Sequence, residues 1–309
     1  MRNRISTGYA SAVLTVIVWG TTFTSTKILL RDFSAHEILF FRSLLAFLVL
    51  YIAKPQKLVL REKKHELLFA CAGLCGITLY HLFENYSLSF TAVANTSLIV
   101  ATSPFFIALL SSAFLKAEKP GPAFYLGFLT ALTGTAIISF NGRIVLALNP
   151  MGDILALCAA LSWALYSILS KLLSQYEYGT LQITRRIFGY NLLFLLPVFF
   201  FSGFRLNPSL LIKPVNLLHI LYLGAVASAM CFGTWNYAIQ TLGALRTSVF
   251  IYLIPVISVT VSAIVLREPV TMMLIGGAAL TLSGLFLSEY KVFLRRGELG
   301  ETSDSSGPA

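Results

Sequence analysis

Long apolar stretches dominate the chain, and short polar segments separate them. Each stretch holds the roughly 20 mostly apolar residues that an α-helix needs to cross the hydrocarbon core of a bilayer. The pattern leaves no room for an extramembrane domain between the stretches, so the loops must be short. It predicts ten transmembrane helices, with soft edges, at 9–30, 36–53, 66–88, 93–115, 122–141, 151–173, 181–203, 215–240, 246–266 and 271–290.

The composition agrees with a membrane protein and argues against several other classes. Hydrophobic residues make up 57% of the 309 residues, and the mean hydropathy is +0.79. Only 12% of the residues are charged, about half of the ~25% typical of soluble domains. A soluble protein of this size would lack the polar residues to cover its surface. The net charge of +10 therefore indicates basic loops beside an anionic membrane, and we expect no nucleic-acid partner.

Lysine and arginine residues predict how the chain is oriented. With the N-terminus inside, the inside segments hold fourteen of these residues and the outside segments hold five. Because cytoplasmic loops carry the excess of positive charge, we expect both termini in the cytoplasm. Residues 1–8 then form the N-terminal segment, and the first span is too long for a cleaved signal segment. The polar, Gly/Ser-rich residues 295–309 are expected to be disordered.

The first half of the chain recurs in the second half. A first set of residues recurs 144 positions later, where Trp19, Lys27 and Arg42 become Trp163, Lys171 and Arg186. A second set recurs 151 positions later, where Gly73, Asn85, Tyr86, Thr96, Ser97 and Pro104 become Gly224, Asn236, Tyr237, Thr247, Ser248 and Pro255. Each copy, 9–141 and 151–290, holds five spans, and an odd number inverts the second copy relative to the first. Inverted repeats are typical of secondary transporters, whose substrate sites lie near the midplane between the halves.

Longer motifs within the two copies resemble a known family. They are VIVWGTTFTSTK at 16–27, FFRSLLAF at 40–47, NYSLSFTAVANTSLIVATSPFF at 85–106 and LKAEKP at 115–120, with second copies LSWALYSILSK at 161–171, TRRIFGYNLL at 184–193, NYAIQTLGALRTSVFIYLIPVI at 236–257 and LREP at 266–269. Over about residues 8–290 the chain resembles the drug/metabolite transporter superfamily, in its ten-helix EamA-type branch. The resemblance implies an all-α fold of two inverted five-helix repeats around a central cavity, which helices 1, 3, 4, 6, 8 and 9 line. Helices 5 and 10 would lie at the periphery.

Aromatic and polar side chains inside these spans are the candidate substrate-binding residues. Trp19, Phe23 and Lys27 lie four residues apart and share one helix face. Their span is rich in hydroxyls, which a wet cavity would use, although such hydroxyls also bond to their own helix. The residues that we expect to face the cavity are Trp19, Phe23, Tyr80, His81, Glu84, Trp163, Tyr166, Trp235 and Asn236.

Glu84 is the acidic residue that lies well inside a span, and His81 is one turn away on the same face. An ionisable group inside a membrane is costly and indicates function, so the pair could contact the substrate or carry a coupling proton. Alternatively, Glu84 simply reaches interfacial water. No third ligand accompanies the pair, so we expect no metal and no cofactor. We interpret the four cysteines as packing residues without disulfides.

Four cations and two prolines have matching positions in the two copies. Lys27, Arg42, Lys171 and Arg186 could cap helix ends and reach the interface with their charged heads. Alternatively, they form symmetry-related gates that close one face of the membrane at a time. Pro104 and Pro255 each remove a backbone hydrogen bond and should kink their helices. The glycines Gly127, Gly134, Gly277 and Gly284 favour close helix packing of helices 5 and 10, within a monomer or at a homodimer contact.

Together these features predict a secondary active transporter in the bacterial inner membrane. We expect it to export a small metabolite such as an amino acid by alternating access, since an excess of intramembrane cations favours a carboxylate-bearing solute. Alternatives are another small solute, such as a sugar phosphate, a nucleoside-type compound or a cationic drug. An intramembrane enzyme is disfavoured because no nucleophile and base converge, and a channel because no ring of pore-lining charges is evident.

Overall fold

The computed structural model describes residues 2–91, 93–115, 120–140, 149–176, 178–202, 207–266, 272–273 and 275–288. Within these ranges the chain is helical and contains no strand. All ten predicted stretches correspond to apolar helices: seven are long enough to cross a membrane, and three shorter ones cover Pro122–Ile138, Ala244–Ser258 and Ile275–Ser288. The predicted all-α membrane fold is thereby confirmed. The predicted tail at 295–309 lies outside the described residues.

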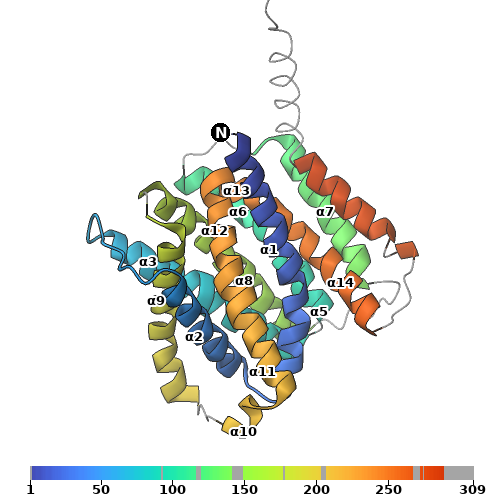
Figure 1. The fold of residues 1–309 in the computed structure, drawn as a ribbon. Helices are drawn as coiled ribbons and strands as arrows, with labels where there is room; N and C mark the ends of the chain where they lie inside the picture. The colour runs from blue at the N-terminus through green and yellow to red at the C-terminus, as the bar shows by residue number, and fades with distance from the viewer. Residues whose placement is uncertain are drawn as a thin grey trace, which may run out of the picture.

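Several spans consist of more than one helical element (Figure 1). The first half comprises α1 (Arg2–Leu29), α2 (Ala35–Ala53), α3 (His65–Gly73), η1 (Leu74–Leu79), α4 (Tyr80–Phe90), α5 (Val93–Val100), α6 (Ser103–Phe114) and α7 (Pro122–Phe140). The second half comprises α8 (Pro150–Leu173), η2 (Ser174–Tyr176), α9 (Thr180–Ser202), α10 (Pro208–Leu211), α11 (Pro214–Leu221), η3 (Tyr222–Met230), α12 (Cys231–Leu242), α13 (Ala244–Ser248), η4 (Val249–Tyr252) and α14 (Leu253–Leu266), followed by the helix Ile275–Ser288.

Local signals in the sequence fix several helix ends. Ser34 and Glu37 form a capping box, in which each side chain bonds to the backbone N–H of the other residue, and this starts α2. Asn149 accepts a hydrogen bond from the backbone N–H of Gly152 at the start of α8. Gly243 separates α12 from α13 with φ of 93°, a conformation that glycine adopts without a steric penalty. The caps and the glycine thus fix where α2 and α8 begin and where α12 ends.

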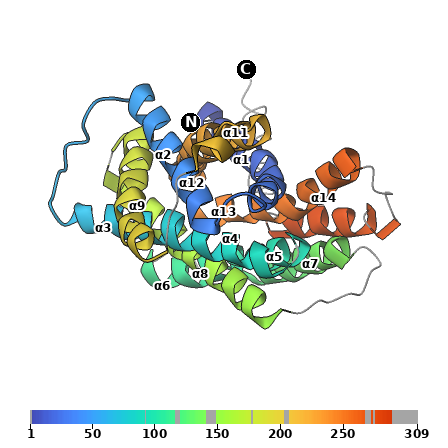
Figure 2. The same ribbon diagram turned by 90° about the horizontal axis from the view of Figure 1, so that it is seen from below.

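The two halves interlock through their first helices. The helix α1 packs against α12 and α14 of the second half, and α8 packs against α4, α5 and α6 of the first half. The helices α2 and α9 also pack side by side. Figure 2, seen from below, shows α1 and α8 on opposite sides of the centre. The space between the halves is therefore enclosed by helices from both copies.

Two spans contain π-helical segments at matching positions, which the sequence pattern did not predict. These segments are η1 and η3, and residues 74–79 shifted by 151 fall within η3 at 225–230. A π-helix disturbs the regular backbone ladder and is frequent at functional sites. Trp19 contacts the second of these segments, since its Nε1 donates to the carbonyl oxygen of Ala227 in η3 at 2.9 Å.

The spans that carry the repeated prolines are interrupted just before each proline. Between α5 and α6 the chain makes a turn at residues 101–102, and Pro104 lies in the first turn of α6. In the second half, the 3₁₀ segment η4 precedes α14, in which Pro255 is the third residue. The missing backbone N–H of a proline is tolerated in the first turn of a helix. The interruptions bring Val100 and Ile251 close to the centre of the molecule.

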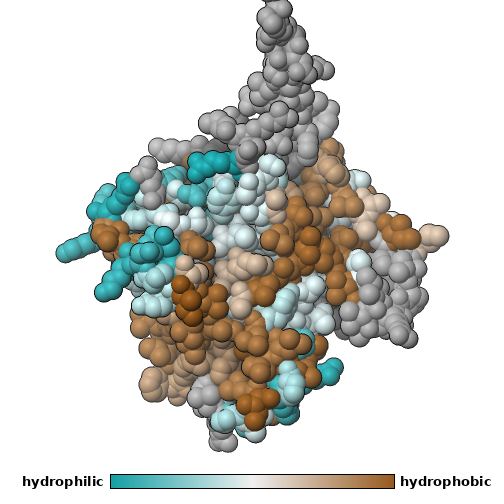
Figure 3. All heavy atoms as spheres, in the orientation of Figure 1, coloured by the Kyte–Doolittle hydropathy of each residue, from teal (hydrophilic) through white to brown (hydrophobic). Residues whose placement is uncertain are grey.

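The repeated glycines pack α7 against the helix Ile275–Ser288 within the chain. A Cβ atom built on Gly127 would lie 2.6 Å from the carbonyl oxygen of Gly284, and one on Gly134 would lie 2.6 Å from that of Gly277. Only glycine allows backbones to approach this closely. The outer surface of the bundle is largely apolar: in Figure 3, brown side chains cover much of the visible face, and hydrophilic ones gather toward its upper left and lower edges.

Candidate functional site

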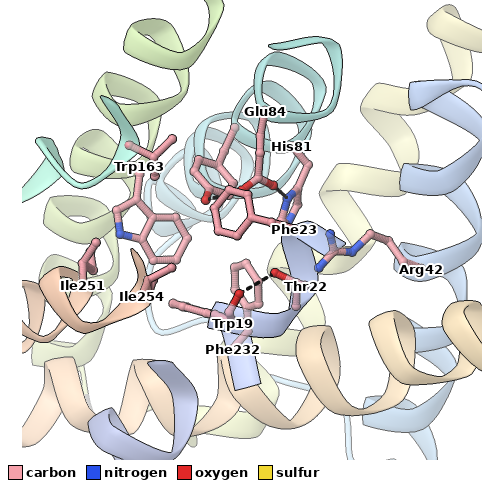
Figure 4. A pocket seen from close by; sticks show the side chains of 12 residues that line it. Trp19, Thr22, Phe23, Arg42, His81, Glu84, Trp163, Phe232, Ile251 and Ile254 are labelled. Atoms are coloured by element: carbon pink, nitrogen blue, oxygen red, sulfur yellow. Dashed lines mark hydrogen bonds and ion pairs between the residues drawn. The ribbon is translucent and has the colours of Figure 1, made fainter. Parts of the chain in front are cut away.

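A small cavity lies at the centre of the molecule, between the two halves. Its volume is about 30 Å³, whereas about 10–15 Å³ on this measure holds one water molecule. The site is therefore contracted, and a metabolite enters it only if the surrounding helices separate. The side chains that line it come from both halves: Trp19, Thr22, Phe23, Arg42, Tyr80, His81, Glu84, Val100, Trp163, Phe232, Ile251 and Ile254 (Figure 4).

Aromatic rings form one wall of this cavity. The rings of Trp19 and Trp163 meet edge to face, with centroids 5.2 Å apart and an angle of 84° between the planes. Phe232 packs against both tryptophans at 5.5 and 5.8 Å. Such edge-to-face contacts bring the positive edge of one ring to the negative face of another. The wall is consequently apolar, and suits the apolar part of a solute.

Polar groups of α4 form the opposite part of the lining. The carboxylate of Glu84 accepts a hydrogen bond from the hydroxyl of Tyr80 at 2.9 Å and pairs with Nδ1 of His81 at 3.1 Å. Tyr80 and His81 precede Glu84 by four and three residues, so all three side chains share one helix face. Glu84 is only 6% exposed, so in this structure its carboxylate faces the cavity and not the outer surface of the bundle.

Arg42 reaches the cavity from α2, on the side where His81 and Glu84 lie (Figure 4). Its side chain is buried, and its Nε donates to Oγ of Ser228 at 3.1 Å. Among the described residues it makes no ion pair with a carboxylate. The sequence pattern placed Arg42 among the gating or capping cations, so its position in the cavity lining is a finding of the structure.

Arg186, the repeat counterpart of Arg42, has different partners. Its guanidinium bonds to both carboxylate oxygens of Glu66 at the start of α3, and the ring of Phe69 lies 5.6 Å away. The hydroxyl of Tyr190 also donates to Glu66. The shift of 151 places Leu217 opposite Glu66, so the second copy offers Arg42 no equivalent carboxylate. The sequence pattern identified only Glu84 as an acidic partner for the cations inside the spans, whereas the structure shows that Glu66 is the partner of Arg186.

The two repeated lysines have equivalent contacts at opposite ends of the molecule. Nζ of Lys27 donates to the carbonyl oxygen of Leu88 near the end of α4. Nζ of Lys171 donates to that of Gln240 near the end of α12 at 3.5 Å. The last carbonyls of a helix have no partner within the helix, and a cation near them also interacts favourably with the helix dipole. Both contacts agree with the capping interpretation of the lysines.

Three predicted site residues lie behind the cavity lining. Trp235 is fully buried, with its ring 5.0 Å from that of Trp19. The side-chain oxygen of Asn236 accepts hydrogen bonds from the hydroxyls of Tyr166 and Ser170, both at 2.7 Å. These contacts hold α8 against α12. The other six predicted residues, Trp19, Phe23, Tyr80, His81, Glu84 and Trp163, line the cavity.

Sequence reasoning missed several lining residues. Val100, Ile251 and Ile254 are aliphatic residues in apolar spans, and nothing in their type distinguishes them from residues facing lipid. Their position next to the interruptions before Pro104 and Pro255 is a signal that could have found them. Within the described residues no group of three or more His, Cys, Asp or Glu side chains could hold a metal ion.

Comparisons with known proteins place this architecture in a family. The sequence profile of the EamA-like transporter family matches residues 6–140 and again residues 150–290. An "Uncharacterized transporter" of Archaeoglobus fulgidus is 28% identical over 283 residues, which cover 90% of this chain and 96% of the relative. One protein of known crystal structure superposes with a TM-score of 0.72 at 19% identity, covering 95% of this chain and 99% of its own.

Two further relatives have more specific names. A "Probable terminal-alkyne amino-acid exporter" of Streptantibioticus cattleyicolor is 27% identical, covering 96% of this chain and 97% of that protein. A "Probable amino-acid metabolite efflux pump" of Salmonella typhimurium is 26% identical, covering 92% of this chain and 95% of that protein. The repeated profile match spans most of the sequence and agrees with the two interlocked halves. The chain belongs to the EamA-like transporter family and is a multi-pass membrane protein.

Proposed function

We propose that the protein exports amino acids or closely related metabolites across a bacterial inner membrane by alternating access. The observation that carries this proposal is the buried cavity between the halves. Its lining combines a carboxylate, a guanidinium and an aromatic wall, which are the groups that recognise a small amphipathic solute. The names of the Streptantibioticus and Salmonella relatives support amino-acid metabolites as the substrate class.

Contacts at both ends of the molecule support an alternating mechanism. At one end, Arg186 and Glu66 join α9 to α3, and Arg185 donates to the carbonyl oxygens of Lys54 and Gln56. At the other end, Asp32 accepts hydrogen bonds from Lys213 and Asn216 at 3.1 and 2.7 Å. We propose that the first end faces the cytoplasm, as the lysine and arginine distribution indicates. Release of one set of contacts would open the cavity to one side at a time.

Glu84 and His81 are the candidates for carrying a coupling proton. Both side chains are buried and bonded to each other, and a carboxylate inside a membrane protein often belongs to a proton relay. Arg42 and Tyr80, which also line this cavity, are the other charged and titratable side chains beside the pair. Exchange of a proton for the solute would drive export against a concentration gradient.

A whole-cell export assay tests the proposed function. Cells that express the protein are supplied with dipeptides, which raise the internal amino-acid pool, and the excreted amino acids are quantified by mass spectrometry. The control is a matched strain that carries the empty vector. We expect faster excretion of at least one amino acid than in the control. Equal excretion of every amino acid, with the protein present in the membrane, would show that the proposed function is wrong.

A further inference from the structure

The cavity contains two opposite formal charges that do not neutralise each other directly. Glu84 is held by Tyr80 and His81, and Arg42 is held by Ser228. Both charged side chains are buried, at 6% and 3% exposure. Burying a charge without an opposite charge is expensive. An oppositely charged group of a solute that enters the cavity would therefore stabilise each of these two side chains.

Both groups retain unused hydrogen-bonding capacity. A guanidinium has five N–H donors, and an ionised carboxylate has about four acceptor positions. Within the described residues Arg42 uses one donor, on Nε. Its two terminal nitrogens do not belong to the buried atoms that lack both solvent contact and a hydrogen-bond partner. Glu84 uses one position on each oxygen. The guanidinium is the side chain best suited to a carboxylate, because two parallel N–H donors match two oxygens.

We propose that Arg42 and Glu84 together recognise the two charges of a zwitterionic α-amino acid. Arg42 binds the α-carboxylate and Glu84 binds the α-ammonium. The protein and the solute thus each contribute one positive and one negative group. This inference rests on the proposed function and adds the substrate class. A net anion or a net cation would leave one buried charge of the cavity without a partner, so the site discriminates against both.

The remaining lining defines the side chain of the solute. Trp19, Trp163 and Phe232 supply rings, and Val100, Ile251 and Ile254 supply aliphatic surface. Apart from Thr22 and the unpartnered indole N–H of Trp163, these parts of the lining offer no hydrogen bond to a polar side chain, so most polar substituents would lose their hydration without compensation. The site therefore fits neutral amino acids with aromatic or branched aliphatic side chains.

The repeat supports a single site of fixed orientation. The positions equivalent to His81 and Glu84 are occupied by Phe232 and Trp235, and the counterpart of Arg42 is bound to Glu66 instead. A second, inverted charge pair is therefore absent from the described part of the cavity lining. The solute keeps one orientation, with its charged end toward α2 and α4 and its side chain toward α1, α8 and α12.

Competition experiments with three matched solutes test the proposal. L-Phenylalanine carries both charges, phenethylamine lacks the carboxylate and 3-phenylpropionate lacks the ammonium. Purified protein in liposomes is assayed by counterflow of labelled phenylalanine. We expect phenylalanine to compete at least about tenfold better than either analogue, because each analogue leaves one charged group unpaired.

Two charge-removing variants should shift this preference in opposite directions. Arg42→Gln should weaken competition by phenylalanine at least about tenfold and make phenethylamine the better competitor. Glu84→Gln should also weaken competition by phenylalanine at least about tenfold, and should make 3-phenylpropionate the better competitor. Because weak phenylalanine binding reduces the counterflow signal, analogue binding to both purified variants is also measured by thermal shift. Lys64→Gln is the matched control, since Lys64 is an exposed cation paired with Glu62 outside the cavity, and it should keep the wild-type order.

The outcomes separate this inference from the proposed function. If amino acids are transported but both variants keep the wild-type order of competitors, Arg42 and Glu84 do not recognise the zwitterion. The inference is also wrong if the wild type moves only charged or strongly polar amino acids, although export itself then stands. If no amino acid moves in cells or in liposomes, both proposals fail. Should Arg42→Gln not fold, Arg42→Lys keeps the charge without the paired donors and should weaken competition by phenylalanine and 3-phenylpropionate, which carry a carboxylate, but not by phenethylamine.

Discussion

Trp19 and Trp163 occupy equivalent positions in the two halves, and their rings touch edge to face at 5.2 Å. The axis that relates the inverted halves must therefore pass close to this contact. The two indoles nevertheless differ: Nε1 of Trp19 donates to Ala227 in η3, whereas Nε1 of Trp163 is buried without a partner. The centre of the molecule is thus symmetric in sequence but asymmetric in its hydrogen bonds.

This difference predicts unequal effects of the same substitution. Both variants should lower the free energy of unfolding, and the loss should be larger for Trp19→Phe. The difference between the two losses should be about 0.6 kcal/mol and at most ~1.7 kcal/mol, which is the range for hydrogen bonds between membrane helices. Trp163→Phe removes an unsatisfied buried donor and loses no hydrogen bond. Unfolding of both variants in mixed detergent micelles measures the difference. Equal losses, or a larger loss for Trp163→Phe, would contradict the observed bonding.

A glycine in the π-helical segment η1 is expected to be essential for packing. A Cβ atom on Gly76 would lie 2.1 Å from Cδ2 of Tyr166, whose ring is fully buried and whose hydroxyl bonds to Asn236. Gly76→Ala should destabilise the protein by about 1–3 kcal/mol, as overpacking typically does. Gly276→Ala is the control, because nothing lies within 4 Å of its added atom. Thermal unfolding in detergent should leave the control unchanged and lower the midpoint of Gly76→Ala.

Proton coupling through Glu84 predicts a loss of pH dependence. Glu84→Gln keeps the shape of the side chain but cannot bind a proton, so an imposed pH gradient should no longer drive transport of the solutes that the variant still accepts. Transport in liposomes with and without the gradient measures this. His81→Gln tests the neighbouring group in the same way. A full response to the gradient in Glu84→Gln would rule out this residue as the coupling site.

The contact between Arg186 and Glu66 is expected to close one side of the protein. Arg186→Ala and Glu66→Gln should both increase labelling, from the cytoplasmic side, of a cysteine placed at Thr22 in a variant without other cysteines. If Arg42 also acts as a gate, Arg42→Ala should increase labelling from the opposite side. Membrane-impermeant thiol reagents applied to each side provide the measurement. Unaltered labelling in both Arg186→Ala and Glu66→Gln would argue against a gate at this end.

The loop before α2 should respond to acid through Asp32. Hydrogen bonds from Asn216 and then from Lys213 hold the pKa of Asp32 below its ordinary value. A lowered pKa in the folded state means that the contact stabilises the fold above the unfolded pKa and that this contribution is lost as the pH falls through the folded pKa. Asp32→Asn should therefore be less stable than the wild type at pH 7, and the gap should close as the pH falls below 3.8 and through the lower pKa of Asp32 in the folded state. A gap independent of pH would exclude this linkage.

Much of the architecture followed from patterns that are local or periodic. Ten apolar stretches predicted ten helices, and the repeats at 144 and 151 positions predicted two copies, because membrane spans must be apolar over a fixed length. The ionisable pair His81 and Glu84 could be identified as functional candidates for the same reason, since charge inside a span is rare and costly.

Only the tertiary structure decided which equivalent residues share a function. The sequence treats Arg42 and Arg186 as a pair, yet the first lines the cavity and the second binds Glu66 at the end of the molecule. Asn236 holds α8 to α12 instead of facing the cavity, because Tyr166 and Ser170 happen to lie opposite it. A helix pattern gives the face on which a side chain lies, but its partners depend on the rotation and separation of neighbouring helices, which arise only when all ten pack together.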